Sequence, residues 1–125
     1  MLQTDTGRIQ ADRLGAVVRL AETFQAVAVL KGACSLVASG AGSVGLCDRG
    51  NPGMATAGMG DVLAGLLGGL AVQLSDLERT ARAGVLIHAI CGDAAAASGE
   101  RGLLAGDLMD QIRGLVNPNH IRYPE

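Results

Sequence analysis

The stretch Asn51-Pro-Gly-Met-Ala-Thr-Ala-Gly-Met-Gly-Asp61 is followed directly by the apolar segment Val62-Leu-Ala-Gly-Leu-Leu-Gly-Gly-Leu-Ala-Val72. The first part is small and turn-forming, which is typical of a tight loop. The second part predicts a helix, Asp61–Gln73, and its apolar composition predicts that this helix is buried on most sides. Asp61 therefore lies at the junction, in the first turn of the predicted helix.

The start of this predicted helix is suited to binding an anion. The first N–H groups of a helix lack partners and carry partial positive charge, and Gly58 and Gly60 leave the backbone open to a ligand. The N–H groups of Gly58, Met59 and Gly60 could hold a phosphate while Asp61 accepts a proton from a hydroxyl. An isolated Gly-x-Gly-Asp would more simply be a loop whose Asp caps a helix.

A second candidate segment, Lys31-Gly-Ala-Cys-Ser35, follows the apolar run Ala26–Leu30. A continuous run of this kind is typical of a strand buried on both faces, and open α/β sheets bind ligands beyond the carboxyl ends of their strands. Lys31 is the single lysine of the chain. Because lysine side chains are mostly exposed for no functional reason, the residues alone leave the role of Lys31 open.

Together these two segments resemble the signatures of the NAD(P)H-hydrate dehydratases, a ribokinase-like family. The family pattern N-P-G-M-A-T-x-G-M-G-D-V-L-x-G matches the chain from Asn51 to Gly65, and K-G-A-x-[ST] matches it from Lys31 to Ser35. Ser35 stands where the family often has Thr, which keeps the hydroxyl. The resemblance extends from about Ile9 to the last predicted helix.

The resemblance implies ADP- or ATP-dependent dehydration of NADHX and NADPHX, the hydrated forms of the reduced nicotinamide cofactors, to NADH and NADPH. In this family the ring hydroxyl is phosphorylated and phosphate is then lost. Asp61 would be the catalytic base and would face the hydrated nicotinamide. The implied adenine-nucleotide site consists of Lys31, Gly32, Ala33, Cys34, Ser35 and Gly60. No protein metal cluster is expected, and Mg²⁺ would be held largely by the nucleotide phosphates.

The family domain is considerably longer than this chain, and the resemblance covers its C-terminal part. We therefore expect residues 1–125 to form a partial domain, the C-terminal portion of a ribokinase-like three-layer α/β/α fold with few strands and several helices. The sheet of such a fold is expected to be doubly wound and parallel. The lost N-terminal half would leave an open, apolar strand edge beside residues 26–30, so we expect a homo-oligomer or association with the N-terminal half.

Two other functions stay open at this point. Another ribokinase-like kinase, acting on a vitamin precursor, would share Gly-x-Gly-Asp but generally lacks the Asn-Pro-Gly-Met-Ala-Thr lead-in. A non-catalytic nucleotide-binding or associating fragment is the second alternative. Nucleotide binding and NADHX turnover would separate these alternatives.

Composition excludes several other classes of protein. Hydrophobic residues make up 49% and aromatic residues 2% of the chain, which favours tightly packed α/β layers over an aromatic-rich β-sandwich. The net charge of −2 gives no indication of a nucleic-acid surface. The longest apolar run, Val62–Val72, is shorter than the roughly 20 residues that span a bilayer. Three widely spaced cysteines form no zinc pattern and favour reduced thiols and a cytoplasmic location.

The remaining segments predict an alternation of helices and strands. The predicted elements are a helix over residues 9–25, strands over 26–30, 35–39 and 44–47, a helix from a capping box at Ser75 and Glu78 to about Ser98, and a short helix Asp107–Arg113. The first helix is expected to bury Leu14, Val17, Val18, Ala21 and Phe24. Residues 1–8 and the tail after Pro118 are expected to be frayed.

Two further features invite functional readings that we reject. Residues 40–45 match G-x-G-x-x-G, but a short strand follows them and no acidic residue lies about 20 positions on, so a hairpin turn is predicted instead of a dinucleotide site. His88 lies mid-helix among apolar neighbours with no nucleophile nearby in sequence. It is expected to be a hydrogen-bonded core histidine.

Overall fold

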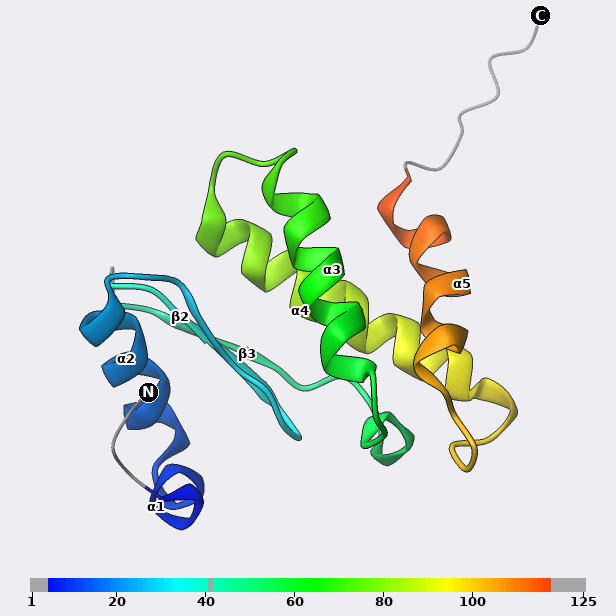
Figure 1. Ribbon diagram of the computed structural model, residues 1–125, viewed down its shortest axis with the longest axis horizontal. Helices are drawn as coiled ribbons and strands as arrows, with labels where there is room; N and C mark the ends of the chain where they lie inside the picture. The colour runs from blue at the N-terminus through cyan, green and yellow to red at the C-terminus, as the bar shows by residue number, and fades with distance from the viewer. Residues whose placement is uncertain (1–4, 41, 118–125) are drawn as a thin grey trace, which may run out of the picture.

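A computed structural model describes residues 5–40 and 42–117 of the chain (Figure 1). The described elements, in chain order, are α1 (Thr6–Ala11), α2 (Arg13–Phe24), β1 (Ala28–Leu30), β2 (Ser35–Ala38), β3 (Val44–Cys47), η1 (Pro52–Met54), α3 (Met59–Ala71), α4 (Leu77–Ala95), η2 (Ala96–Ser98) and α5 (Ala105–Val116). Among these residues, no helix is both long enough and apolar enough to cross a membrane. The predicted frayed tail lies outside the described residues, and the predicted frayed start is wrong from Thr6 onward, where α1 begins.

The three described strands form one antiparallel sheet in the order β1-β2-β3. Val37 at its centre pairs with Val29 on one side and with Gly45 on the other. The expected parallel arrangement is therefore wrong for β1 and β2, because the connection between them is too short for the crossover that parallel strands require. The predicted hairpin is confirmed, since β2 and β3 pair antiparallel with Ala38 opposite Val44.

The two faces of β2 belong to two different apolar clusters. Leu36 and Ala38 pack with Val17 and Ala21 of α2, whereas Val37 packs with residues of α3 and α4. Alternation of side chains along a strand accounts for this division. Figure 1 shows α2 on one side of the sheet and α3 with α4 on the other, which confirms the predicted α/β/α layers.

The predicted helix over residues 9–25 is interrupted at Asp12. The carboxylate Oδ1 of Asp12 accepts the N–H of Gly15 at 2.8 Å and so caps the start of α2. The predicted buried face is also partly wrong, because Leu14 is 57% exposed and Phe24 is 52% exposed. These two residues lie at the two ends of α2, beyond the part of the helix that packs on the short strands.

α3 is buried on one side only, contrary to the prediction. Met59 and Leu63 near its start are each 5% exposed, whereas Val72, just after its end, is 86% exposed. Its covered side packs closely on α4, since a Cβ atom at Gly84 would lie 2.5 Å from Leu67 Cδ2. On the other side, Cβ atoms added at the three glycines of the second and third turns would meet nothing within 4 Å: Gly65, Gly68 and Gly69.

α4 begins one residue later than the predicted capping box requires. Asp76, and not Ser75, is its N-cap, and the Asp76 carboxylate accepts the N–H of Arg79 at 3.0 Å. Glu78 instead binds the Ser39 hydroxyl and Arg82 Nη2, the latter at 2.6 Å. These hydrogen bonds, that from Ser39 first, lower the pKa of the Glu78 carboxyl. Glu78 thereby ties α4 to the end of β2 instead of closing a capping box.

α5 packs against α4 at the end that lies away from the sheet (Figure 1). It contributes Leu108 to a third buried cluster, together with Met59, Cys91 and Leu103. The predicted helix Asp107–Arg113 lies inside α5, and Asp107 Oδ2 accepts the N–H of Leu104 at 2.8 Å. The third cluster joins the start of α3 to both later helices.

Candidate functional site

The glycine-rich loop ends at Gly58, where α3 begins. Gly58 is the N-cap residue and has a φ of 85°, a left-handed conformation that favours glycine. Its carbonyl oxygen accepts the N–H groups of Asp61 and Val62, each at 3.0 Å. In the described part of the chain, no side chain caps this helix start. The first N–H groups of α3 are thus available to an external acceptor, as the sequence predicts.

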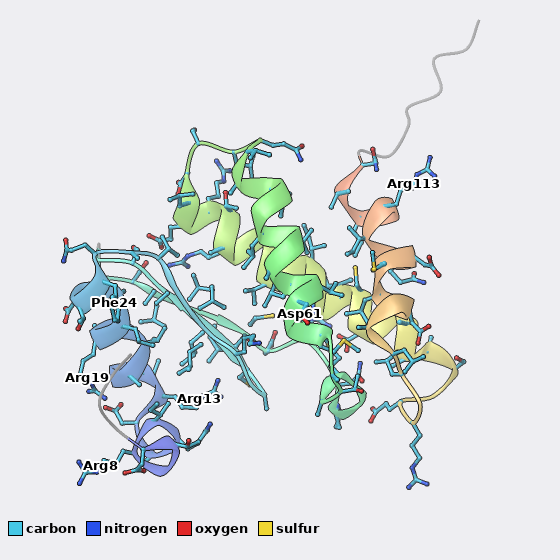
Figure 2. All side chains as sticks on the ribbon, in the orientation of Figure 1. Arg8, Arg13, Arg19, Phe24, Asp61 and Arg113 are labelled. Carbon is cyan, nitrogen blue, oxygen red and sulfur yellow. The ribbon has the colours of Figure 1, made fainter. Side chains whose placement is uncertain are left out.

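Asp61 lies in the first turn of α3 with its side chain exposed. Figure 2 shows it at the N-terminal end of this helix, in the region between the sheet and α5. Met59, two residues earlier, is buried in the third apolar cluster and anchors the turn. The arrangement places a solvent-accessible carboxylate beside free backbone donors.

Lys31 meets the glycine-rich loop in space. A Cβ atom built on Gly60 would lie 2.3 Å from Lys31 Nζ, so the ammonium group rests against the backbone of Gly60. The side chain of Lys31 is exposed, as expected for a group that would contact a ligand. The two segments singled out in the sequence therefore converge, with a positive charge next to the helix start and Asp61 adjacent in the chain.

The loop of residues 31–35 has an unusual backbone. Gly32 has a φ of 150°, and Cys34 has a φ of 58°, which is uncommon for a residue with a side chain. The Ser35 hydroxyl donates to the carbonyl of Gly32 at 3.3 Å, which closes the loop on itself. Ala33 and Cys34 are exposed, so this predicted nucleotide segment faces solvent.

Arg13, at the start of α2, holds this loop through hydrogen bonds to its backbone carbonyls. Its Nη1 donates to the carbonyl of Ala33 at 2.6 Å, and its Nη2 donates to the carbonyls of Lys31 at 3.3 Å and Leu30 at 3.4 Å. A Cβ atom at Gly32 would lie 2.9 Å from Nη2, so glycine is needed for this close approach. Sequence reasoning missed Arg13, because its partners are distant backbone carbonyls that no motif or spacing indicates.

His88 of α4 lies beneath the start of α3. Its Nε2 lies 2.9 Å from the carbonyl oxygen of Met59, to which it donates a hydrogen bond. Burial lowers the pKa of the His88 imidazole, the bond to Met59 opposes this shift, and the charge of Lys31 adds to the lowering. The prediction of a hydrogen-bonded, partly buried histidine is confirmed.

A metal ion would find few protein ligands at this site. Within the part of the chain that the structure describes, no three His, Cys, Asp or Glu side chains lie close enough to hold an ion. Mg²⁺ is often held mainly by the phosphates of a nucleotide and by water, which needs no cluster of protein carboxylates. The residues present thus fit a Mg²⁺ ion that arrives with a nucleotide.

Comparisons with known proteins agree with this picture. A family model described as NAD(P)H-hydrate dehydratase matches residues 1–113. The chain is 47% identical over 119 residues to the bifunctional NAD(P)H-hydrate repair enzyme Nnr of Coxiella burnetii, covering 94% of this chain and 24% of that enzyme. It is 40% identical to an ADP-dependent (S)-NAD(P)H-hydrate dehydratase of Neisseria meningitidis, covering 94% of this chain and 40% of that enzyme.

A solved structure shares the fold. The ADP/ATP-dependent NAD(P)H-hydrate dehydratase of Bacillus subtilis, co-crystallised with ATP/Mg²⁺ and soaked with CoA, superposes with a TM-score of 0.86 at 27% identity. The match covers 92% of this chain and 43% of that one. The chain thus spans about a quarter of the bifunctional relative and less than half of the solved dehydratase.

Proposed function

This chain belongs to the NAD(P)H-hydrate dehydratase family, and from that premise we propose that it contributes the phosphate site and the catalytic base for ADP- or ATP-dependent dehydration of NADHX and NADPHX. The observation that carries the proposal is the approach of Lys31 Nζ to the backbone of Gly60, immediately before Asp61. This approach brings a cation, free helix-start donors and a carboxylate together. A phosphoryl-transfer site requires these three components.

Each component has a distinct role in the proposed reaction. The segment Lys31–Ser35 and Gly60 bind the adenine nucleotide, and the N–H groups of Gly58, Met59 and Gly60 hold the phosphoryl group in transfer. Asp61 accepts the proton of the ring hydroxyl while the hydroxyl oxygen forms a bond to the terminal phosphorus of the nucleotide. The bond between that phosphorus and the oxygen of the leaving nucleotide breaks in the same step. Loss of that phosphate, with cleavage of the ring carbon–oxygen bond and release of a proton from the adjacent ring carbon, then forms the carbon–carbon double bond of the dihydronicotinamide.

The proposed phosphoryl donor is ADP or ATP, accompanied by Mg²⁺. Support comes from the names of the relatives, one of which is ADP-dependent and another ADP/ATP-dependent and co-crystallised with ATP/Mg²⁺. When bound, Mg²⁺ would neutralise charge on the nucleotide phosphates. The three unpaired cysteines favour a reducing compartment, so we propose the cytoplasm as the location.

The chain spans less than half of the solved dehydratase, and we propose that further protein completes the site for the hydrated cofactor. The open side of α3 and the free edge of β1, one of the two edge strands, are places where further protein would pack, as each presents unpartnered surface within the described residues. We propose that the rest of the domain, on the same polypeptide or a separate one, covers these two surfaces. Where that part is absent, we propose that a second copy of this chain covers them. Light scattering at micromolar concentration tests this. A folded monomer with a sharp thermal transition would contradict it.

Calorimetric titration with ADP, followed by an assay of dihydronicotinamide recovery from NADHX, tests the function. We expect ADP to bind the chain alone, and turnover to require the rest of the domain added in trans or restored in cis. Binding without turnover under both conditions would favour a non-catalytic nucleotide-binding fragment. No binding by the folded, completed domain would overturn the proposal.

A further inference from the structure

The first residues of the glycine-rich loop are hydrogen-bonded to α4. Asp93 Oδ2 accepts the backbone N–H of Gly50 at 3.1 Å, and Asp93 Oδ1 accepts the side-chain amide of Asn51 at 3.1 Å. The same amide donates to the carbonyl of Gly92 at 3.0 Å. Hydrogen bonds to a carboxylate are stronger than those between neutral groups. One turn of α4 therefore fixes the backbone before the loop turns toward the site.

The same helix holds the end of the loop. His88, just over one helical turn before Asp93, donates from Nε2 to the carbonyl of Met59 at 2.9 Å. Met59 is the first residue of α3 and directly precedes Gly60. This bond fixes the direction in which the first turn of α3 leaves the loop.

The middle of the loop rests on α4 and on the segment that follows it. A Cβ atom at Gly92 would lie 2.2 Å from Met54 Sδ, and a Cβ atom at Gly53 would lie 2.5 Å from the carbonyl oxygen of Glu100. Both positions thus need glycine so that the loop can approach closely. Met54 also packs against the third apolar cluster.

From these contacts we infer that α4 is the template that shapes residues 50–61, with Asp93 and His88 as positioning residues for the phosphate site. The inference rests on the proposed function, because the purpose of the loop's shape is to aim the N–H groups of residues 58–60 and Asp61. Asp93 acts through Asn51 and Gly50, and His88 acts through Met59, so neither side chain needs to touch the nucleotide.

Four variants test the inference by ADP titration below the unfolding temperature of each. Asp93→Leu removes both acceptors, His88→Leu removes the donor, and His88→Gln keeps a donor at similar reach. Val85→Ala is the matched control. Val85 lies on α4 and is buried against the sheet, so its truncation should destabilise the helix without changing a contact to the loop. We expect both leucine variants to weaken ADP binding roughly tenfold or more, the Gln variant to recover most of the affinity, and the control to bind normally.

Amide hydrogen exchange gives a second readout that needs no nucleotide. The N–H groups of Gly50, Met54 and Asp61 should exchange faster in the leucine variants, while that of Val37 in β2 should not change. If Asp93→Leu does not fold, Asp93→Asn, which loses one of the two acceptors, should show the same pattern more weakly. Equal effects in Val85→Ala, or unchanged exchange over residues 50–61, would overturn the inference. Absence of ADP binding in the wild-type chain, with the exchange pattern as expected, would count against the proposed function alone.

Discussion

The loop of residues 31–35 and the loop of residues 50–60 meet at Lys31 and Gly60, but they differ in which residues take left-handed conformations. In the second loop, left-handed conformations fall on glycines, Gly50 and Gly58. In the first loop one of them falls on Cys34, and the guanidinium of Arg13 holds the backbone from another layer of the molecule. Side chains from other elements hold both loops, Arg13 in the first and Asp93 and His88 in the second. The difference is that glycines at the left-handed positions mark the second loop in the sequence, whereas Cys34 does not mark the first.

In the proposed function the second loop carries the chemistry and the first binds the nucleotide. The sharpest test is Asp61→Asn in the completed domain, where we expect turnover to fall about 10²- to 10⁴-fold because the amide cannot accept the hydroxyl proton. ADP affinity should change far less. Asp110→Asn is the matched control, since Asp110 is an exposed carboxylate in the middle of α5. Full turnover by Asp61→Asn would reduce Asp61 to a residue that offsets the helix dipole.

Removing the support of the first loop should have the next largest effect. Arg13→Ala leaves three backbone carbonyls without their donor, and we expect the free energy of unfolding to fall by about 1–2 kcal/mol. Arg19 on the same helix forms an exposed ion pair with Asp12 at 3.2 Å, so Arg19→Ala should cost less than about 1 kcal/mol. Figure 2 labels both arginines on α2. Equal losses in chemical denaturation would mean that Arg13 is not a special support.

The contact between the loops is tested by Lys31→Ala and Gly60→Val. The first removes the ammonium group, and the second puts a side chain where Lys31 Nζ now lies, so both should weaken ADP binding about tenfold, or about 1.4 kcal/mol. The fold should tolerate Gly60→Val, because the atom that must move is the end of a flexible side chain. Gly114→Val in α5, where an added Cβ meets nothing within 4 Å, is the control. Unchanged affinity in both site variants would place the nucleotide elsewhere.

The strained backbone at Cys34 in the first loop predicts that a glycine there would make the fold slightly more stable. Cys34→Gly relieves a left-handed conformation at a residue with a side chain, and the greater flexibility of glycine in the unfolded chain offsets part of the benefit. We expect thermal denaturation to show a net stabilisation of about 0.5 kcal/mol. Cys47→Gly in β3 should instead lower stability, because Cys47 packs against the second apolar cluster. A loss of stability in Cys34→Gly would show that the loop is not strained.

The smallest expected effect concerns how the free energy of unfolding depends on pH. Burial depresses the pKa of His88 in the folded chain, so below the ordinary value of about 6.5 the unfolded chain binds a proton that the folded chain does not. The contribution of His88 to stability is therefore complete above that pH and is lost as pH falls toward the lower folded value. Unfolding measured from pH 7 downward should show this loss in the wild type and not in His88→Gln. Identical pH profiles would exclude His88 as the source.

The resemblance to the dehydratase family implied that residues 31–35 and Gly60 share one site, and the structure brings Lys31 beside Gly60. The sequence also predicted the three layers and the hairpin. The antiparallel sheet could have been inferred from the short connections between strands. The break at Asp12 and the cap at Asp76 were missed because several nearby residues can cap equally well.

Other misses depend on contacts remote in sequence. The exposure of Leu14 and Phe24 is set by how little of α2 the short strands cover. The open side of α3 cannot be inferred from its composition, because an apolar helix is expected to be covered. Arg13 and Asp93 bind backbone groups in other elements, and a single sequence contains no trace of such pairings.

The decline in burial along α3, from Met59 and Leu63 at its start to Val72 just beyond its end, sets the direction in which this helix opens. Its last turn belongs to a weakly protected unit and should fray readily, whereas its first turn shares the core of α4 and α5 and opens only with the cooperative unfolding of that core. A protease would therefore cleave near residue 72 long before it reached Asp61. The end of α3 that carries the proposed phosphate site should thus stay formed while the far end fluctuates.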